Sequence, residues 1–487
     1  MAHGISHSQR WLALYILCLG VLMIVLDSTI VNVALPSIRE DLQFTETSLV
    51  WVVNAYLLTF GGLLLLGGRL GDVLGHRRVF LGGLALFTLA SAACGLATTQ
   101  SMLIIGRAVQ GVGGAVVSAA ALSLIMNVFT EPGERAKAMG IYGFVCSGGG
   151  SIGVLLGGLL TDSVGWHWIF LVNVPIGIAV YVACQMLIPA GRGMAGAPRL
   201  DWLGAIIVTG AMLLAVYAIV NGNEVGWLSP RTLVKLGIAA VMMVAFLHIE
   251  SRIEAPLMPP ALLRRKSVTT ANLIAVLWAA GMFAWFFISA LYLQLVLGRD
   301  PLEVGLAFLP ANLIMAACSL GISARLVMRF GLRGPLVAGL LIAACGLLLF
   351  ARAPVDGSVW LDVIPAMALL GVGAGIAFNP LLLAAMNDVP PSESGLASGM
   401  VNTSFMMGGA LGLAVLASLA AAHTQNALPA DGLQQAGAAV EALNAGYRLA
   451  FAAGAGFVIL GAALGAALIR GAGAAVAAPA GSGGHGL

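Results

Sequence analysis

Fourteen long apolar runs constrain this chain more than any other feature of its sequence. Their lengths lie near the roughly 20 residues that a helix needs to cross the hydrocarbon core of a bilayer. The runs occupy residues 11–35, 49–67, 79–97, 102–128, 138–160, 168–188, 202–221, 233–249, 268–297, 304–324, 336–351, 361–385, 396–421 and 447–469. None alternates between polar and apolar residues as the strands of a membrane barrel do. The sequence therefore predicts an all-α polytopic membrane protein with fourteen spans.

Composition supports this class. Hydrophobic residues make up 60% of the chain, charged residues make up 9%, and the mean hydropathy is +1.01. Soluble domains are about 45–50% apolar and about 25% charged. The net charge of +3 is spread over the loops between spans. We therefore expect the lipid bilayer, and no nucleic acid, as a partner.

The positions of the cations predict the orientation. Sixteen of the 23 Lys and Arg residues fall on the side of the amino terminus, six fall on the other side, and Arg107 lies within a span. Loops rich in Lys and Arg stay in the cytoplasm. The expected location is the plasma (inner) membrane, with both termini cytoplasmic.

A repeated loop predicts an internal duplication. Arg69, Leu70, Gly75 and Arg77 match Arg325, Leu326, Gly331 and Arg333, whereas Asp72 is matched by Met328. Such repeats are typical of secondary transporters. We expect a six-helix bundle in residues 1–190, a linker with two extra transmembrane helices in 191–266, a second six-helix bundle in 267–470 and a disordered cytoplasmic tail in 471–487.

Asp27 is the acid that the sequence places deepest in the membrane. Apolar residues precede it back to Trp11, and a carboxylate at that depth is costly unless it faces a partner or a cavity. Arg107 lies six residues after Ser101 in a span of opposite direction, which places it within about one helical turn of the depth of Asp27. We expect the two side chains to meet and to take part in proton coupling. The alternatives are a structural clamp for Asp27 and an arginine that extends to the interface.

The first repeated loop is a candidate gate. Two glycines allow a tight turn between spans, and Asp72 can face a helix amino terminus or an arginine of the other bundle. A contact of this kind would close the inner side and break when the protein opens inward. The predicted gating residues are Gly68, Arg69, Gly71, Asp72, Gly75, Arg77 and Arg78.

Glycines in three spans are spaced for close helix contact. The predicted packing positions are Gly111, Gly114, Gly149, Gly153, Gly157 and Gly158. Gly408 and Gly412 occupy the equivalent place in the second half.

Aromatic and polar residues supply candidates for a substrate cavity. Trp278, Met282, Trp285, Ser289 and Tyr292 recur on one helical face, which would form an aromatic wall if it lined a cavity and would mean little if it faced lipid. Asn54, Gln110 and Gln294 are uncharged intramembrane groups that either line the cavity or join helices.

Neither the cysteines nor the histidines of the chain predict a metal site. All six cysteines lie within predicted spans, so we expect free, buried thiols. His3 and His7 are too few and too close to the terminus for a metal site, and we expect transport to be driven by the proton gradient without a cofactor.

Together these motifs resemble the major facilitator superfamily, and within it the fourteen-helix drug:proton antiporter family of multidrug efflux type. The resemblance rests on residues 26–36, 68–78, 107–114, the glycine run in 149–158, and 166–177. It implies a major facilitator fold, a proton-coupling role for Asp27 and Arg107, and gating by the loop that contains Asp72. One departure is Val154, which stands where that family usually has proline.

The expected function is therefore proton-coupled export of amphipathic small molecules, lipophilic or cationic drugs and xenobiotics, by alternating access. An exporter of an endogenous metabolite, such as a siderophore or lipid, would use the same machinery. A non-transport membrane scaffold is the third alternative. We expect no enzyme, because apart from Asp27 and Arg107 no polar groups cluster at one membrane depth.

Overall fold

The computed structural model describes residues 7–129, 131–188, 200–253, 256–390, 393–428 and 436–469. This part of the chain is helical and contains no strand. Fourteen helical segments are long and apolar enough to cross a membrane, which confirms the predicted number of spans.

The spans form a continuous series along the chain. The first bundle contains α1 (His7–Leu42), α2 (Glu46–Leu74), α3 (His76–Gly95), α4 (Gln100–Val128), α5 (Pro132–Ser163), α6 (Trp168–Leu171) and α7 (Asn173–Leu187). The inserted pair is α8 (Trp202–Val220) and α10 (Pro230–Glu250), with the short α9 (Gly222–Val225) between them. After α11 (Pro260–Leu263), the second bundle contains α12 (Lys266–Leu291), η2 (Tyr292–Val296), α13 (Pro301–Ala317), η3 (Cys318–Ile322), α14 (Ser323–Phe330), α15 (Arg333–Phe350), η4 (Val359–Val363), α16 (Ile364–Met386), α17 (Ser394–Ala427) and α18 (Ala436–Leu468).

Local capping explains why several helices begin before the apolar run does. The Thr45 hydroxyl accepts from the Ser48 N–H at the start of α2, and the Ser48 side chain accepts from the Thr45 N–H in return. Asp300 and Glu303 form the same reciprocal cap at the start of α13, directly before Pro301. These side chains satisfy amide groups that have no partner within the helix.

Some single apolar runs are not single helices. The run at 168–188 is divided at Val172 into α6 and α7. Three π-helical turns, η2, η3 and η4, interrupt or begin spans of the second bundle. Hydrophobic periodicity did not predict these turns, because it does not distinguish one helical hydrogen-bond register from another.

The two bundles repeat the same pattern of packing. In the first, α1 packs against α5 and α7, and α4 packs against α2 and α3. In the second, α12 packs against α17 and α18, and α16 packs against α13 and α15. The bundles meet along two seams, α2 with α17 and α5 with α13, which are equivalent under the repeat.

The repeated loop matches this duplication at one backbone position. Gly75, between α2 and α3, has a φ of 93°, and Gly331, between α14 and α15, has a φ of 72°. Side chains other than glycine rarely adopt this region. The aligned glycines therefore end equivalent helices in the two halves.

The two inserted helices are central in the sequence and peripheral in space. They pack against each other, and α8 also contacts α2 and α17. They therefore lie beside the α2/α17 seam.

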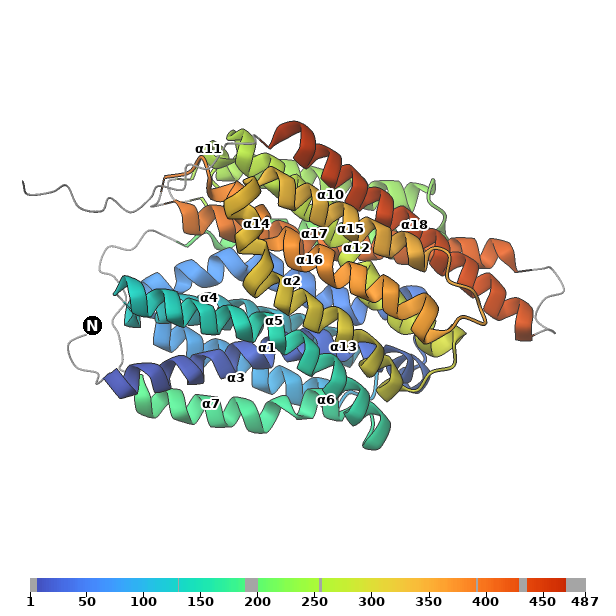
Figure 1. Ribbon diagram of the computed structural model, residues 1–487, viewed down its shortest axis with the longest axis horizontal. Helices are drawn as coiled ribbons and strands as arrows, with labels where there is room; N and C mark the ends of the chain where they lie inside the picture. Colours follow the sequence, from blue (N-terminus) through green and yellow to red (C-terminus); the bar gives the residue numbers. More distant parts are fainter. Residues whose placement is uncertain are drawn as a thin grey trace, which may run out of the picture.

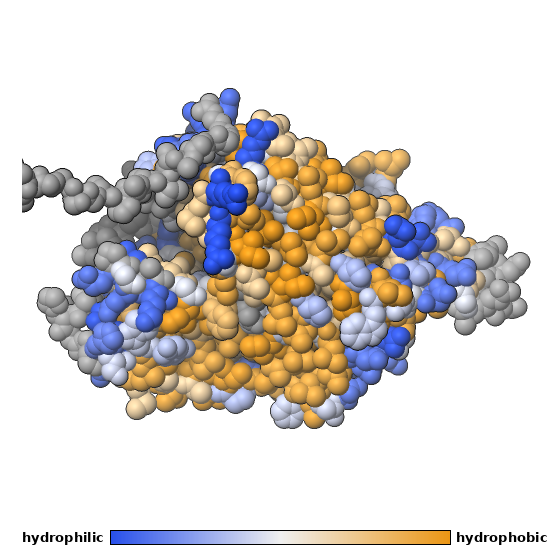
Figure 2. All heavy atoms as spheres, viewed as in Figure 1, coloured by the Kyte–Doolittle hydropathy of each residue, from blue (hydrophilic) through white to orange (hydrophobic). Residues whose placement is uncertain are grey.

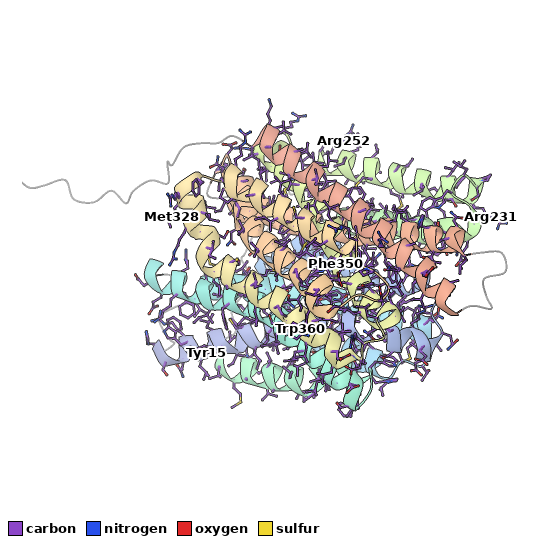
Figure 3. All side chains as sticks on the ribbon, turned by 45° about the vertical axis from the view of Figure 1, so that its right-hand side comes forward. Tyr15, Arg231, Arg252, Met328, Phe350 and Trp360 are labelled. Atoms are coloured by element: carbon purple, nitrogen blue, oxygen red, sulfur yellow. The ribbon has the colours of Figure 1, made fainter. Side chains whose placement is uncertain are left out.

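The surface agrees with a membrane location. The helices run along the long axis of Figure 1, and in Figure 2 apolar residues cover the middle of the visible face while hydrophilic residues gather toward its two ends. Figure 3 shows Arg231 and Arg252 at opposite ends of α10. We call the end that carries the start of α1 and the α2/α3 turn the hairpin face, and the other end the opposite face.

Several expectations need correction or fall outside the described residues. Cys18, Cys94, Cys184 and Cys318 are buried free thiols, but Cys345 is exposed because its face of α15 is not covered by another helix. The expected tail, 471–487, and most of the first linker, 189–199, lie outside the described residues, as does the side chain of Cys146.

Candidate functional site

Asp27 and Arg107 form an ion pair inside the first bundle. Asp27, on α1, is 0% exposed, and Arg107, on α4, is 1% exposed. The distance from Arg107 Nη1 to Asp27 Oδ2 is 2.5 Å. The expected contact between these two side chains is confirmed.

Two amide side chains complete the contacts of the carboxylate. Gln110 Nε2 donates to Asp27 Oδ1 at 2.6 Å, and Asn173 Nδ2 donates to the same oxygen at 3.1 Å. Both amides also approach the hydroxyl oxygen of Ser91 on α3, at 2.7 and 3.5 Å. Four helices, α1, α3, α4 and α7, thus converge on one buried carboxylate.

The guanidinium of Arg107 has further partners in the same network. Its Nε donates to the carbonyl oxygen of Val52 at 3.0 Å, and its Nη1 also donates to Gln110 Oε1 at 2.7 Å. Its Cζ lies 4.4 Å from the ring centroid of Tyr56 and 5.6 Å from that of Phe170. Such cation–π contacts stabilise a desolvated cation.

This network satisfies an ionised carboxylate. Three donors point at the two oxygens of Asp27, and an ionised carboxylate only accepts hydrogen bonds. Gln110 has opposite ends of its amide turned toward the two charges, with Oε1 at Arg107 and Nε2 at Asp27. Protonation of Asp27 would therefore change which atom of the Gln110 amide, the oxygen or the nitrogen, can hydrogen-bond to it.

Sequence reasoning identified only part of this site. Gln110 was expected as a cavity or helix-joining residue, and the structure gives it the second role. Ser91, Asn173 and Tyr56 were not expected in the site. Asn173 lies at the start of a span in the segment that carries the resemblance, which was a usable signal, whereas serine and tyrosine are too common in apolar spans to identify a partner.

The hairpin residues differ from the expected loop. Residues 68–74 are helical, so the turn itself is Gly75. Gly71 lies within α2, where an added Cβ would overlap the His76 ring. Asp72 Oδ1 is 3.3 Å from His76 Nε2, so this carboxylate faces the start of α3 and not an arginine of the second bundle.

Two of the remaining hairpin residues contact the chain outside the turn. Arg69 donates to the Pro256 carbonyl oxygen beyond α10, and Arg77 Nη2 donates to the Gln185 carbonyl oxygen of α7 at 2.7 Å. Arg78 is exposed, and a Cβ on Gly68 would have Ala119 as its nearest contact, at 4.0 Å.

The expected aromatic wall lies inside the protein. Trp278, Met282, Trp285, Ser289 and Tyr292 are each at most 5% exposed, which excludes lipid contact in this structure. Trp278 packs on Phe405 at 5.3 Å between ring centroids, and Trp285 packs on Phe308 at 5.9 Å. The Tyr292 hydroxyl donates to the Pro354 carbonyl oxygen at 2.8 Å, so this tyrosine ties η2 to the connection between α15 and η4.

Two predicted polar residues join the bundles. Asn54 Nδ2, on α2, donates to the Ala410 carbonyl oxygen of α17 at 3.0 Å. Gln294 Nε2, in η2, donates to the Val33 carbonyl oxygen of α1 at 2.8 Å. Both side chains therefore act across the interface between the bundles.

The predicted glycines lie at close helix contacts. A Cβ on Gly111 would overlap Thr59 of α2, and one on Gly114 would lie 3.1 Å from Phe60 Cδ2. On α5, added Cβ atoms at Gly149, Gly153 and Gly157 would meet α1, whereas one at Gly158 would meet Leu302 of α13 at 2.9 Å. Val154, at the position of the family's proline, is 1% exposed and packs beside Gly305 of α13.

Within the described residues, no three His, Cys, Asp or Glu side chains are grouped so that they could hold a metal ion. His3 lies outside them.

Comparison with known proteins places these features in a family. The model of the Major Facilitator Superfamily matches residues 17–413. The chain belongs to the Major Facilitator Superfamily. It is accordingly a multi-pass membrane transporter, with two six-helix bundles and two inserted helices.

Several relatives in this superfamily have assigned roles. The chain is 40% identical to the puromycin resistance protein pur8 of Streptomyces alboniger over 95% of this chain and 92% of that protein. It is 38% identical to the cephamycin export protein CmcT of Amycolatopsis lactamdurans over 86% of each. It is 36% identical to the multidrug resistance protein Stp of Mycobacterium tuberculosis over 84% of this chain and 77% of that protein.

A solved structure supports the fold. A bacterial homolog of the human lysosomal transporter Spinster, in an inward-facing and occupied conformation, matches 94% of this chain and 97% of that chain, with a TM-score of 0.67 and 18% identity.

Proposed function

We propose that this transporter is a proton-coupled antiporter that exports amphipathic small molecules across the plasma membrane by alternating access. The relatives are named for resistance to, or export of, antibiotics and drugs. The observation that carries the proton-coupling part is the fully buried Asp27 carboxylate, held by Arg107 at 2.5 Å. An acid at such a position in a transporter is a natural proton carrier.

The proton step follows from the hydrogen bonds of the site. Binding a proton at Asp27 turns one acceptor oxygen into a donor, so a donor that faces it must turn away. Rotation of the Gln110 amide exchanges Oε1 and Nε2 and so presents an acceptor to the protonated acid. The same rotation turns an N–H toward Arg107, which has no acceptor. Because the protonated acid also no longer carries the charge that pairs with Arg107, the hold of α4 on α1 weakens.

This local change has a short route to the bundle interface. Asp27 and Val33 lie on the same helix, and the Val33 carbonyl oxygen accepts from Gln294 of the second bundle. A shift of α1 would therefore alter a contact across the seam. Gly149, Gly153 and Gly157 pack α5 closely on α1, so a shift of α1 would be carried to α5, which meets α13 across the other seam.

Three buried donors of the second bundle are candidate contacts for cargo. The indole N–H groups of Trp278 and Trp285 and the amide nitrogen of Asn312 are buried and have no hydrogen-bond partner among the described residues. Asn312 Oδ1 lies 3.8 Å from a Cβ added on Gly150 of α5, which places this side chain at the interface. Unpaired buried donors beside aromatic rings favour cargo that has an apolar body and acceptor atoms, and the rings also attract cations.

A second candidate keeps this mechanism and changes the cargo to one metabolite made by the cell. The export of a single named compound by one relative favours it. The two candidates differ in the range of compounds that trigger transport.

The test is substrate-triggered proton movement in inside-out membrane vesicles. We expect a lipophilic cation to release protons with the wild-type chain and not with Asp27→Asn at equal expression. Asp162→Asn is the control, because Asp162 is an exposed acid near the end of α5. Equal signals from wild type and Asp27→Asn would refute the role of Asp27, and no signal from any compound in the wild type would refute antiport.

A further inference from the structure

Two acidic residues outside the Asp27 network are buried together at the hairpin face. Asp201 caps α8 and is 5% exposed, and Glu250 ends α10 and is 1% exposed. The sequence placed both at the ends of apolar runs and gave no sign of their burial. Leu66 of α2, Ala205 of α8 and Leu257 form a buried apolar cluster at this end of the inserted pair.

Each carboxyl group has one oxygen bonded to the backbone. Asp201 Oδ1 accepts from the Gly204 N–H at 2.8 Å, and Glu250 Oε2 accepts from the Met258 N–H at 2.9 Å. The other two oxygens, Asp201 Oδ2 and Glu250 Oε1, are buried and accept no hydrogen bond from any of the described residues. An unpaired acceptor of this kind is expensive in an apolar environment.

The two unpaired oxygens share one small space. A Cβ added on Gly204 would overlap Asp201 Oδ2 and would lie 2.7 Å from Glu250 Oε1. Two ionised carboxylates in such a space repel each other, whereas a single proton lets one carboxyl group donate to the other. One proton between the two carboxyl groups would therefore satisfy both unpaired oxygens.

The charge around the pair agrees with one proton. Among the described residues, the charged groups that act on Glu250 are Asp201 and Arg69, and Arg69 of α2 also faces Asp72. His248 and Arg252, near the same end of α10, are exposed. Within the part of the chain that the structure describes, one arginine balances a pair with a single negative charge and leaves a doubly ionised pair uncompensated.

We propose that Asp201 and Glu250 hold one proton between them and form a second proton-binding site, which fastens the inserted helices to the hairpin that carries Arg69. Arg69 donates to the Pro256 carbonyl oxygen, in the same connection as Met258. Loss of the proton to water leaves two negative charges on the pair. The second charge draws the Arg69 guanidinium away from Pro256 and releases the connection between α10 and α12 from α2.

The direct test is infrared spectroscopy of the purified full-length protein in lipid bilayers, with no cargo and no gradient. The signal is the C=O stretch of protonated carboxyl groups, followed as pH is raised. We expect Glu250→Gln to remove a component of about one carboxyl group per chain that is present in the wild type. Asp201→Asn is the second variant, since asparagine keeps the helix cap, and we expect the same loss.

Two controls make the outcome specific. Asp162→Asn changes an exposed carboxylate near the end of α5 and should leave the component unchanged. Asp27→Asn should also leave it in place, so that failure of this site is distinguishable from failure of the proposed antiport. An unchanged spectrum in both Glu250→Gln and Asp201→Asn would overturn the proposal. So would loss of the component on addition of sodium chloride at constant pH, because the site would then bind a metal cation.

Discussion

The contact between Asp27 and Arg107 predicts a strong energetic coupling. Asp27→Asn keeps the shape of the side chain but leaves the Arg107 charge, 1% exposed, without its counter-ion. Arg107→Gln likewise leaves the buried Asp27 charge without its counter-ion. Removing one partner of a buried ion pair costs about 3–5 kcal/mol, because the remaining charge is desolvated and unpaired. We expect each single substitution to lower the free energy of unfolding by that amount.

The double substitution should cost less than the sum of the two single ones. With both charges removed, the amide groups at positions 27 and 107 hydrogen-bond to each other and to Gln110, and no unpaired charge remains. Residues that share a buried network show interaction energies of up to about 3 kcal/mol. We therefore expect a coupling energy of about 2–3 kcal/mol in the double-mutant cycle.

The assay is unfolding of the purified protein in mixed detergent micelles, followed by tryptophan fluorescence for all four members of the cycle. The matched control is the cycle on Arg299 and Glu303, a pair at 3.5 Å whose side chains are 40% and 47% exposed. Exposed pairs four residues apart contribute about 0.5 kcal/mol or less. If the two single costs at Asp27 and Arg107 simply add, the pair does not interact and the account of the site is refuted.

Two further predictions concern glycines. Gly153→Ala should destabilise the protein by about 1–3 kcal/mol in the same assay, because the new Cβ overlaps Thr29 of α1. Gly82→Ala is the control, because its Cβ would have no described atom within 4 Å, and it should change stability by less than about 1 kcal/mol. Equal effects of the two substitutions would contradict the packing argument. Gly75→Ala should lower the free energy of unfolding by about 1–3 kcal/mol, because a φ of 93° is strained for any residue with a side chain. Gly68→Ala, within α2, should be close to neutral. A neutral Gly75→Ala would show that the turn rearranges to accept the side chain.

The sequence predicted the central ion pair by depth alone. Helix rise fixes how far each residue lies from the membrane surface, so Asp27 and Arg107 could be matched in height before any contact was known. Depth does not fix direction around the helix axis. Ser91, Asn173 and Tyr56 were therefore missed, although they face the same network.

The aromatic residues of α12 show the same limit of sequence reasoning. Their spacing places Trp278 and Trp285 on one helical face, and this was correct. Spacing does not say what covers that face, and the covering residues, Phe405 and Phe308, come from α17 and α13. Only the assembled bundle decides between lipid, cavity and core.

By itself, the sequence determined the fourteen spans, the duplication and the depth of the buried charges, because these depend on the hydrophobic thickness of the bilayer and on local helix geometry. Tertiary structure decided which side chains meet. It turned Asp72 toward His76, placed the inserted helices beside the α2/α17 seam, and brought Asp201 and Glu250 together over Gly204. These contacts join residues far apart in the chain, and their partners are set by the rotation and packing of whole helices, which no local pattern encodes.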